Sequence, residues 1–97
     1  MKFNFQRYIP YLSTLLLDNK FRPSIFTNQS FVLMDGHKLS VEDLDNLKEY
    51  YNIAIETILE LDKNGIKADR VSFGKYFIII NRIESVKKYL IRTRKGE

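Results

Sequence analysis

A long amphipathic segment between residues 40 and 65 constrains the fold of this chain more than any other feature. Ser40 is an N-cap candidate, and Asn64-Gly65 supplies the left-handed stop that ends many helices. This pattern predicts either one helix of about 23 residues or two helices broken near Tyr51-Asn52. The apolar residues in between follow helical spacing, at Leu44, Leu47, Tyr51, Ile55, Ile58, Leu59 and Leu61.

Shorter signals indicate the structure of the remaining chain. Residues 9–18 predict a helix that tolerates Pro10 in its first turn. The polar residues 27–30 indicate a loop, and the apolar run 31–34 before a turn at Asp35-Gly36 indicates a short strand. Residues 85–92 predict a last short helix.

Residues 71–80 have the sequence of a β-hairpin. Two β-rich runs, 71–73 and 76–80, flank Gly74-Lys75, which is a two-residue Gly-X loop. We therefore expect an α+β fold with helices, a hairpin and a third strand contributed by residues 31–34.

Length and composition favour one small soluble domain. The 97 residues are 44% hydrophobic, enough for one modest core, so residues 1–97 are expected to form a single domain with a basic, flexible tail at 92–97. The chain has no cysteine, no run of 18 apolar residues and no small-residue signal cleavage site after its first apolar run. These features favour a cytoplasmic protein.

No catalytic or metal-binding signature is present in the sequence. The single histidine, His37, lies in a Gly-His-Lys turn without a second histidine or a cysteine to share a metal. No nucleophile–base pair or phosphate-binding glycine loop is visible. We therefore expect neither an enzyme nor a cofactor.

The net charge of +4 is distributed unevenly along the chain. Residues 41–64 carry seven acids and two lysines, whereas residues 65–97 carry nine lysines and arginines against three acids. This segregation predicts one acidic face and one basic face suited to phosphates.

The stretch LSVEDLDNLKEYYNIAIETILELDKNGI resembles the second and third helices of a winged helix-turn-helix, with residues 71–80 as the wing. In that family the third helix usually enters the major groove and the wing touches DNA backbone or minor groove. The chain is also similar to the TcpK-type relaxosome accessory proteins of clostridial conjugative plasmids. This resemblance implies a role in plasmid transfer or other mobile-element DNA processing.

The would-be recognition helix departs from the family pattern because it carries Glu56, Glu60 and Asp62, which would repel phosphates. The hypothesis is therefore that a basic wing binds double-stranded DNA, as a homodimer or in several copies and with other DNA-processing proteins. The alternative is a small phage- or plasmid-encoded interaction module or inhibitor that uses the acidic helix. The candidate DNA-binding residues are Lys63, Asn64, Lys67, Arg70, Ser72, Lys75 and Arg82.

Overall fold

The computed structural model describes residues 5–67 and 70–95, and this part of the chain is helical with no strand. The predicted α+β fold is therefore wrong, and the domain is all-α. Its elements are a 3-10 helix η1 (Phe5–Tyr8), α1 (Ile9–Leu17), α2 (Pro23–Leu33), α3 (Val41–Lys63) and α4 (Arg70–Lys95).

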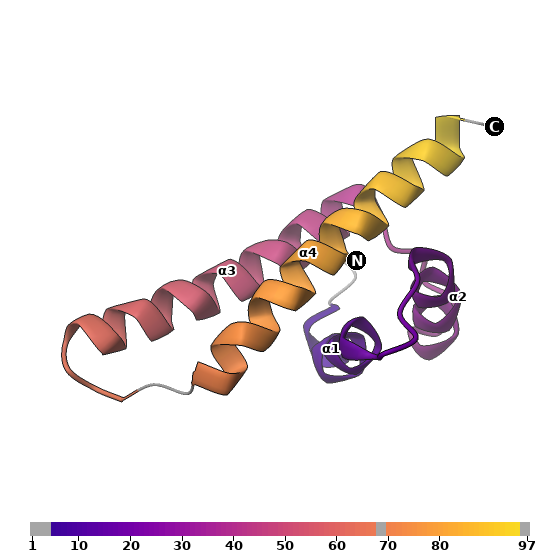
Figure 1. Cartoon of the computed structure of the whole chain (residues 1–97). Helices are drawn as coiled ribbons and strands as arrows, with labels where there is room; N and C mark the ends of the chain where they lie inside the picture. Colours follow the sequence, from indigo (N-terminus) through magenta and orange to yellow (C-terminus); the bar gives the residue numbers. More distant parts are fainter. Residues whose placement is uncertain (1–4, 68–69, 96–97) are drawn as a thin grey trace.

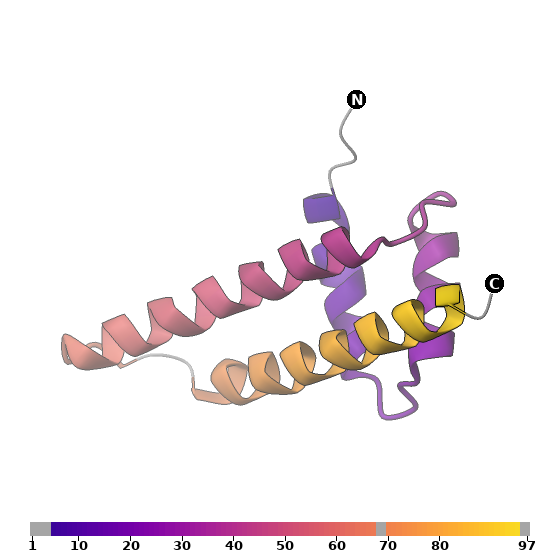
Figure 2. The ribbon, with the colours of Figure 1, turned by 90° about the horizontal axis from the view of Figure 1, so that it is seen from above.

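The two long helices α3 and α4 form an antiparallel hairpin (Figure 1). The short helices α1 and α2 cross the hairpin on one side and cover only the half that holds the start of α3 and the end of α4 (Figures 1 and 2). The other half projects beyond them. The radius of gyration is accordingly 14.6 Å, compared with about 12.5 Å for a compact domain of this length.

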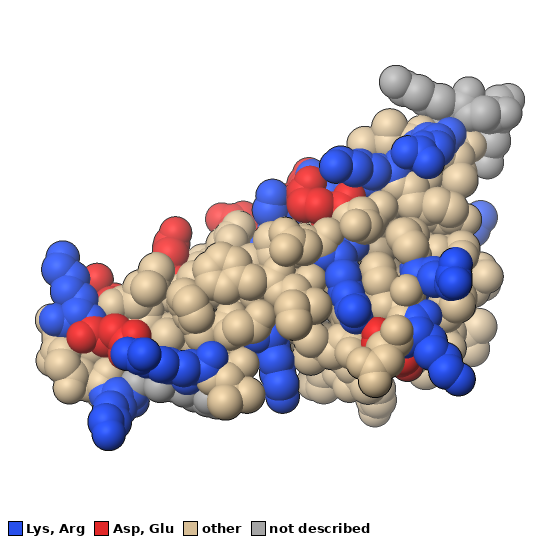
Figure 3. All heavy atoms as spheres, in the orientation of Figure 1, with Lys and Arg blue, Asp and Glu red and all other residues tan. Residues whose placement is uncertain are grey.

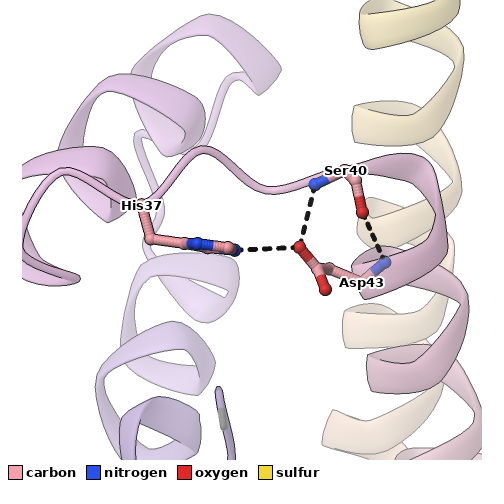
Figure 4. A network of polar contacts seen from close by, with 3 residues as sticks. All are labelled: His37, Ser40 and Asp43. Atoms are coloured by element: carbon pink, nitrogen blue, oxygen red, sulfur yellow. Dashed lines mark hydrogen bonds and ion pairs between the residues drawn. The ribbon is translucent and has the colours of Figure 1, made fainter. Parts of the chain in front are cut away.

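Both ends of α3 are closed by the residues that the sequence indicated. At its start, the Ser40 hydroxyl accepts from the Asp43 N–H and the Asp43 carboxylate accepts from the Ser40 N–H, each at 3.0 Å (Figure 4). At its end, the Gly65 N–H donates to the Asp62 carbonyl and the Ile66 N–H donates to the Leu61 carbonyl, while Gly65 has a φ of 77°. These bonds form a capping box and a Schellman motif.

Between these caps α3 is a single helix of 23 residues, so the first of the two predicted alternatives is confirmed and the second, a break near Tyr51-Asn52, is wrong. Tyr51 is 1% exposed, and its hydroxyl hydrogen-bonds that of Ser13 on α1. Leu47 and Ile55, one turn to either side, are buried as well. The weak helix propensity of Asn52 amounts to only about 0.7 kcal/mol, which burial of this apolar stripe outweighs.

The capping box is expected to make stability depend on acidic pH. Burial raises the pKa of Asp43. Hydrogen bonds from the Ser40 N–H and the His37 ring, together with the charge of His37, lower it by more, so the pKa lies below its ordinary value. The stabilisation from this site is therefore complete above about pH 4 and is lost as the pH falls below that value. Urea midpoints measured from pH 7 to pH 3 should fall less for Asp43→Asn than for the natural chain. Equal falls would contradict this role.

Residues 71–80, the expected hairpin, are the first turns of α4, so the predicted β-wing is wrong. Tyr76, Ile79 and Ile83 follow a helical spacing that places them against the core, with the latter two 1% and 0% exposed. The β-branched and aromatic residues therefore gain more from packing against α3 than their strand preference is worth.

Replacing Gly74 by alanine distinguishes the helix from the hairpin. A Cβ at Gly74 would meet no atom within 4 Å, and the residue does not have a positive φ. Gly74→Ala should therefore stabilise the protein by about 0.5–1 kcal/mol, measured by chemical denaturation. A Gly-X hairpin turn would need a positive φ at this residue, so destabilisation by alanine would contradict the helix.

The predicted loop at residues 27–30 and the strand at residues 31–34 are also wrong, because residues 27–33 belong to α2 and Met34 is its C-cap. Pro23 begins the helix after an extended Arg22, as expected of a residue before proline. Phe26, Ser30 and Met34, spaced four residues apart, are buried. The predicted turn after this run is correct: Asp35 and Gly36 have φ of 56° and 81°.

The core lies where α1 and α2 meet the covered half of the hairpin. The predicted helix at residues 9–18 is confirmed as α1. The side chains of this core are Leu12, Leu16, Phe26, Met34, Leu39, Leu44, Leu47, Tyr51, Ile79, Ile83 and Val86. Basic residues 92–95 continue α4, and residues 96–97 lie outside the described part.

Candidate functional site

Six of the seven candidate residues gather at the projecting end of the hairpin, although no wing carries them. We define this end as residues 53–67 of α3 and the following loop together with residues 70–78 of α4. It contains Lys63, Asn64, Lys67, Arg70, Ser72 and Lys75.

Two of these six, Asn64 and Ser72, are held within the fold of the hairpin. Asn64 is the C-cap of α3, and its side-chain amide donates to the Glu60 carbonyl at 3.0 Å. Ser72 is half-buried on α4. The four basic residues at this end are exposed, and they are the ones able to meet a partner: Lys63, Lys67, Arg70 and Lys75.

Arg82, the seventh candidate, lies away from this end and holds α1. Its Nη1 donates to the carbonyls of Leu16 at 2.6 Å and Asp18 at 2.8 Å, and its guanidinium lies 4.9 Å from the centre of the Phe21 ring. A cation at a helix C-terminus satisfies carbonyls that lack intrahelical partners and complements the helix dipole. Arg82 therefore joins α4 to the C-terminal end of α1.

The projecting end also exposes large apolar side chains, three of which lie in the segment predicted to be a hairpin. Leu59 is 51% exposed on α3, and Phe77 is 47% exposed on α4. The Phe77 ring packs edge-on against Phe73 with the ring centres 4.9 Å apart. The exposed set at this end is Ile53, Leu59, Ile66, Val71, Phe77 and Ile78. The four-residue spacing of Phe73 and Phe77 was the signal for a helical cluster.

These apolar residues are not covered because α1 and α2 do not reach this end (Figures 1 and 2). In the covered half, the hairpin buries Leu44, Leu47 and Val86 against the short helices. A helix pair needs another layer on which to bury an apolar stripe. The projecting end therefore keeps these apolar side chains exposed.

Opposite charges are paired across the covered half of the hairpin. Lys48 contacts Glu84 at 2.8 Å, and Lys87 contacts both Asp45 and Glu84. The hydrogen bond from Lys48 is the main cause that lowers the pKa of Glu84, and the bond to Asp45 is the main cause that raises the pKa of Lys87. The acidic α3 and the basic α4 thus attract one another where they are covered.

At the projecting end, charges of both signs are exposed instead. Glu56, Glu60 and Asp62 on α3 are exposed, as are the four basic residues named above. Figure 3 shows Lys and Arg side chains interleaved with Asp and Glu at this end of the molecule. The surface therefore combines apolar side chains with acidic and basic side chains.

No protein-family model matches the chain, and comparisons with curated proteins and with solved structures found no match. The resemblance to a winged helix-turn-helix, and with it to the TcpK-type accessory proteins, is wrong because the described residues form no β-wing and α3 has no helix-turn-helix break.

Residues 5–67 and 70–95 contain neither a metal-binding cluster nor a membrane-spanning helix. No cluster of three or more His, Cys, Asp or Glu side chains there could hold a metal ion. Among those residues, no helix has the length and apolar character needed to cross a membrane.

Proposed function

We propose that this chain is a helical protein-interaction module that docks through the projecting end of the α3–α4 hairpin. The observation that carries the proposal is the cluster of exposed apolar residues on a part of the hairpin that α1 and α2 leave uncovered. Exposed apolar patches rimmed by polar residues are typical of protein-binding surfaces. The continuous α3 also supports this role, because it leaves no separate recognition helix to enter a DNA groove.

The charges at this end favour a protein over a nucleic acid. Three exposed acids on α3 lie at the same end as the exposed basic residues. Nucleic-acid binding draws most of its affinity from cations that meet phosphates, so nearby carboxylates weaken it. A protein surface can instead complement both signs of charge and cover the apolar residues.

Site-specific photocrosslinking in the cells that express the protein tests this proposal. A photoreactive phenylalanine analogue at position 77 should yield a covalent adduct with one defined protein, identified by mass spectrometry. The same analogue at Ile91, 43% exposed near the other end of α4, is the matched control and should yield no such adduct. The absence of a protein adduct at position 77, or equal adducts at both positions, would overturn the proposal.

Binding to double-stranded DNA is a second candidate, favoured by the charge of α4. This helix carries eight lysines and arginines and one acid. Arg82 and Lys87 contact other parts of the chain, but Arg70, Lys75, Lys88 and Arg92 are exposed. A basic helix of this kind is suited to phosphate contacts.

Affinity for duplex DNA at about 50 mM and about 200 mM salt tests the second candidate. Arg70→Ala and Lys75→Ala should each weaken binding for all sequences alike and reduce the salt slope by about one unit. Asn52→Ala and Thr57→Ala, on exposed positions of α3, are the controls and should have little effect. If none of the four variants changes the affinity, DNA binding through this end is excluded.

A further inference from the structure

We infer that the partner of the projecting end is a second copy of this chain, and that two hairpin ends pack side by side as a symmetric four-helix bundle. This inference rests on the proposed function and names its partner. Three features of the molecule support it: its excess surface, the presence of both signs of charge at the hairpin end, and the missing layer at that end.

The chain exposes more surface than a compact monomer of its mass. Its accessible surface is 7046 Å², whereas the size scaling for an 11.5 kDa monomer gives about 5,800 Å². The excess is about 1,200 Å², and a standard protein interface buries about 800 Å² on each partner. An interface of standard size at the hairpin end would thus bring the exposed surface of each copy closer to the value for a compact monomer.

The charges of the hairpin end are complementary to themselves. α3 presents the exposed acids Glu56 and Glu60, and α4 presents the exposed bases Arg70 and Lys75 at the same end. In a two-fold interface the same patch meets its own copy, so a contact from α3 to the partner's α4 occurs twice. An end with one sign of charge would repel its copy, whereas an end that carries both signs can pair opposite charges at both contacts.

A second hairpin also supplies the layer that this end lacks. Leu59 and Phe77 lie on neighbouring helices, and both are about half exposed. Packing of two antiparallel helix pairs is the arrangement of four-helix bundles, whose cores are built from such inward-facing apolar side chains. The two copies would keep their α1–α2 layers at opposite ends of the assembly.

Sedimentation velocity of the full chain at concentrations up to about 200 µM tests this inference. The natural chain should sediment with twice its monomer mass of 11.5 kDa. Leu59→Glu and Phe77→Glu should each weaken dimerisation at least about tenfold, because each buries a charge without a partner. Circular dichroism should show unchanged helicity, since both positions are half exposed in the monomer. Val32→Glu on α2, 73% exposed, is the control and should remain dimeric.

Charge-reversal variants test how the two copies are oriented in the dimer, without changing an apolar residue. Lys75→Glu should weaken the dimer, and adding Glu60→Lys should restore it. A chain that stays monomeric at all concentrations overturns the inference, while an adduct with a different protein at position 77 would still support the proposed function. A dimer that survives both hairpin variants but is lost in Val32→Glu would overturn the placement of the interface.

Discussion

Replacing Ile83 by alanine is expected to lower the free energy of unfolding by about 2–5 kcal/mol. Ile83 is 0% exposed and lies in the core on α4. Alanine would remove buried methyl and methylene groups and leave a cavity that the surrounding helices can fill only in part. Because the total free energy of unfolding of a native protein is about 5–15 kcal/mol, this loss would be a large share of the protein's stability. Urea denaturation followed by circular dichroism measures it.

Ile91→Ala is the matched control for this prediction, because it makes the same chemical change on the same helix at an exposed position. It should cost less than about 1 kcal/mol. The slope of the unfolding free energy against urea should not change in either variant. Equal losses for the two variants would mean that α4 does not bury the face described above.

Replacing Arg82 by alanine is expected to cost about 1.5–3 kcal/mol, the range for hydrogen bonds to a charged group. The variant leaves the Leu16 and Asp18 carbonyls without their guanidinium donor and removes the cation that lies against Phe21. The same denaturation experiment measures the loss. Arg82→Lys should recover part of it, since lysine keeps the charge but has no planar guanidinium to lie against the ring.

Arg92→Ala is the control for Arg82, because it removes an exposed arginine from the same helix. Its effect on stability should stay within about 0.5 kcal/mol. If Arg82→Ala were as mild as Arg92→Ala, the contact between α4 and the end of α1 would not contribute to folding.

For the candidate site, the residue type alone predicted only in part which basic side chains are exposed. Lys67, Arg70 and Lys75 were selected as exposed cations, and the structure does place them at one exposed end. Arg82 could not be separated from them by sequence, because its role depends on carbonyls more than 60 residues earlier in the chain. Exposed apolar residues of α3 such as Leu59 were missed because a hydrophobic side chain is normally expected to be buried, and only the position of α1 and α2 shows which ones are not covered.

The sequence by itself determined the features that depend on neighbouring residues. Ser40 with Asp43 starts α3, Gly65 stops it, and Asp35-Gly36 forms a turn. Each of these depends on hydrogen bonds or backbone angles within a few residues, so local chemistry is sufficient.

Only the tertiary structure decided the helical state of residues 71–80 and 27–33. The β-branched and aromatic residues of 71–80 and 31–33 favour strands locally, the polar residues 27–30 favour a loop, and Gly74 costs a helix about 1 kcal/mol. Packing of Ile79 and Phe26 into a core shared by distant helices outweighs that preference. Long-range burial of apolar area therefore made residues 5–67 and 70–95 all-α and left one end of the hairpin exposed.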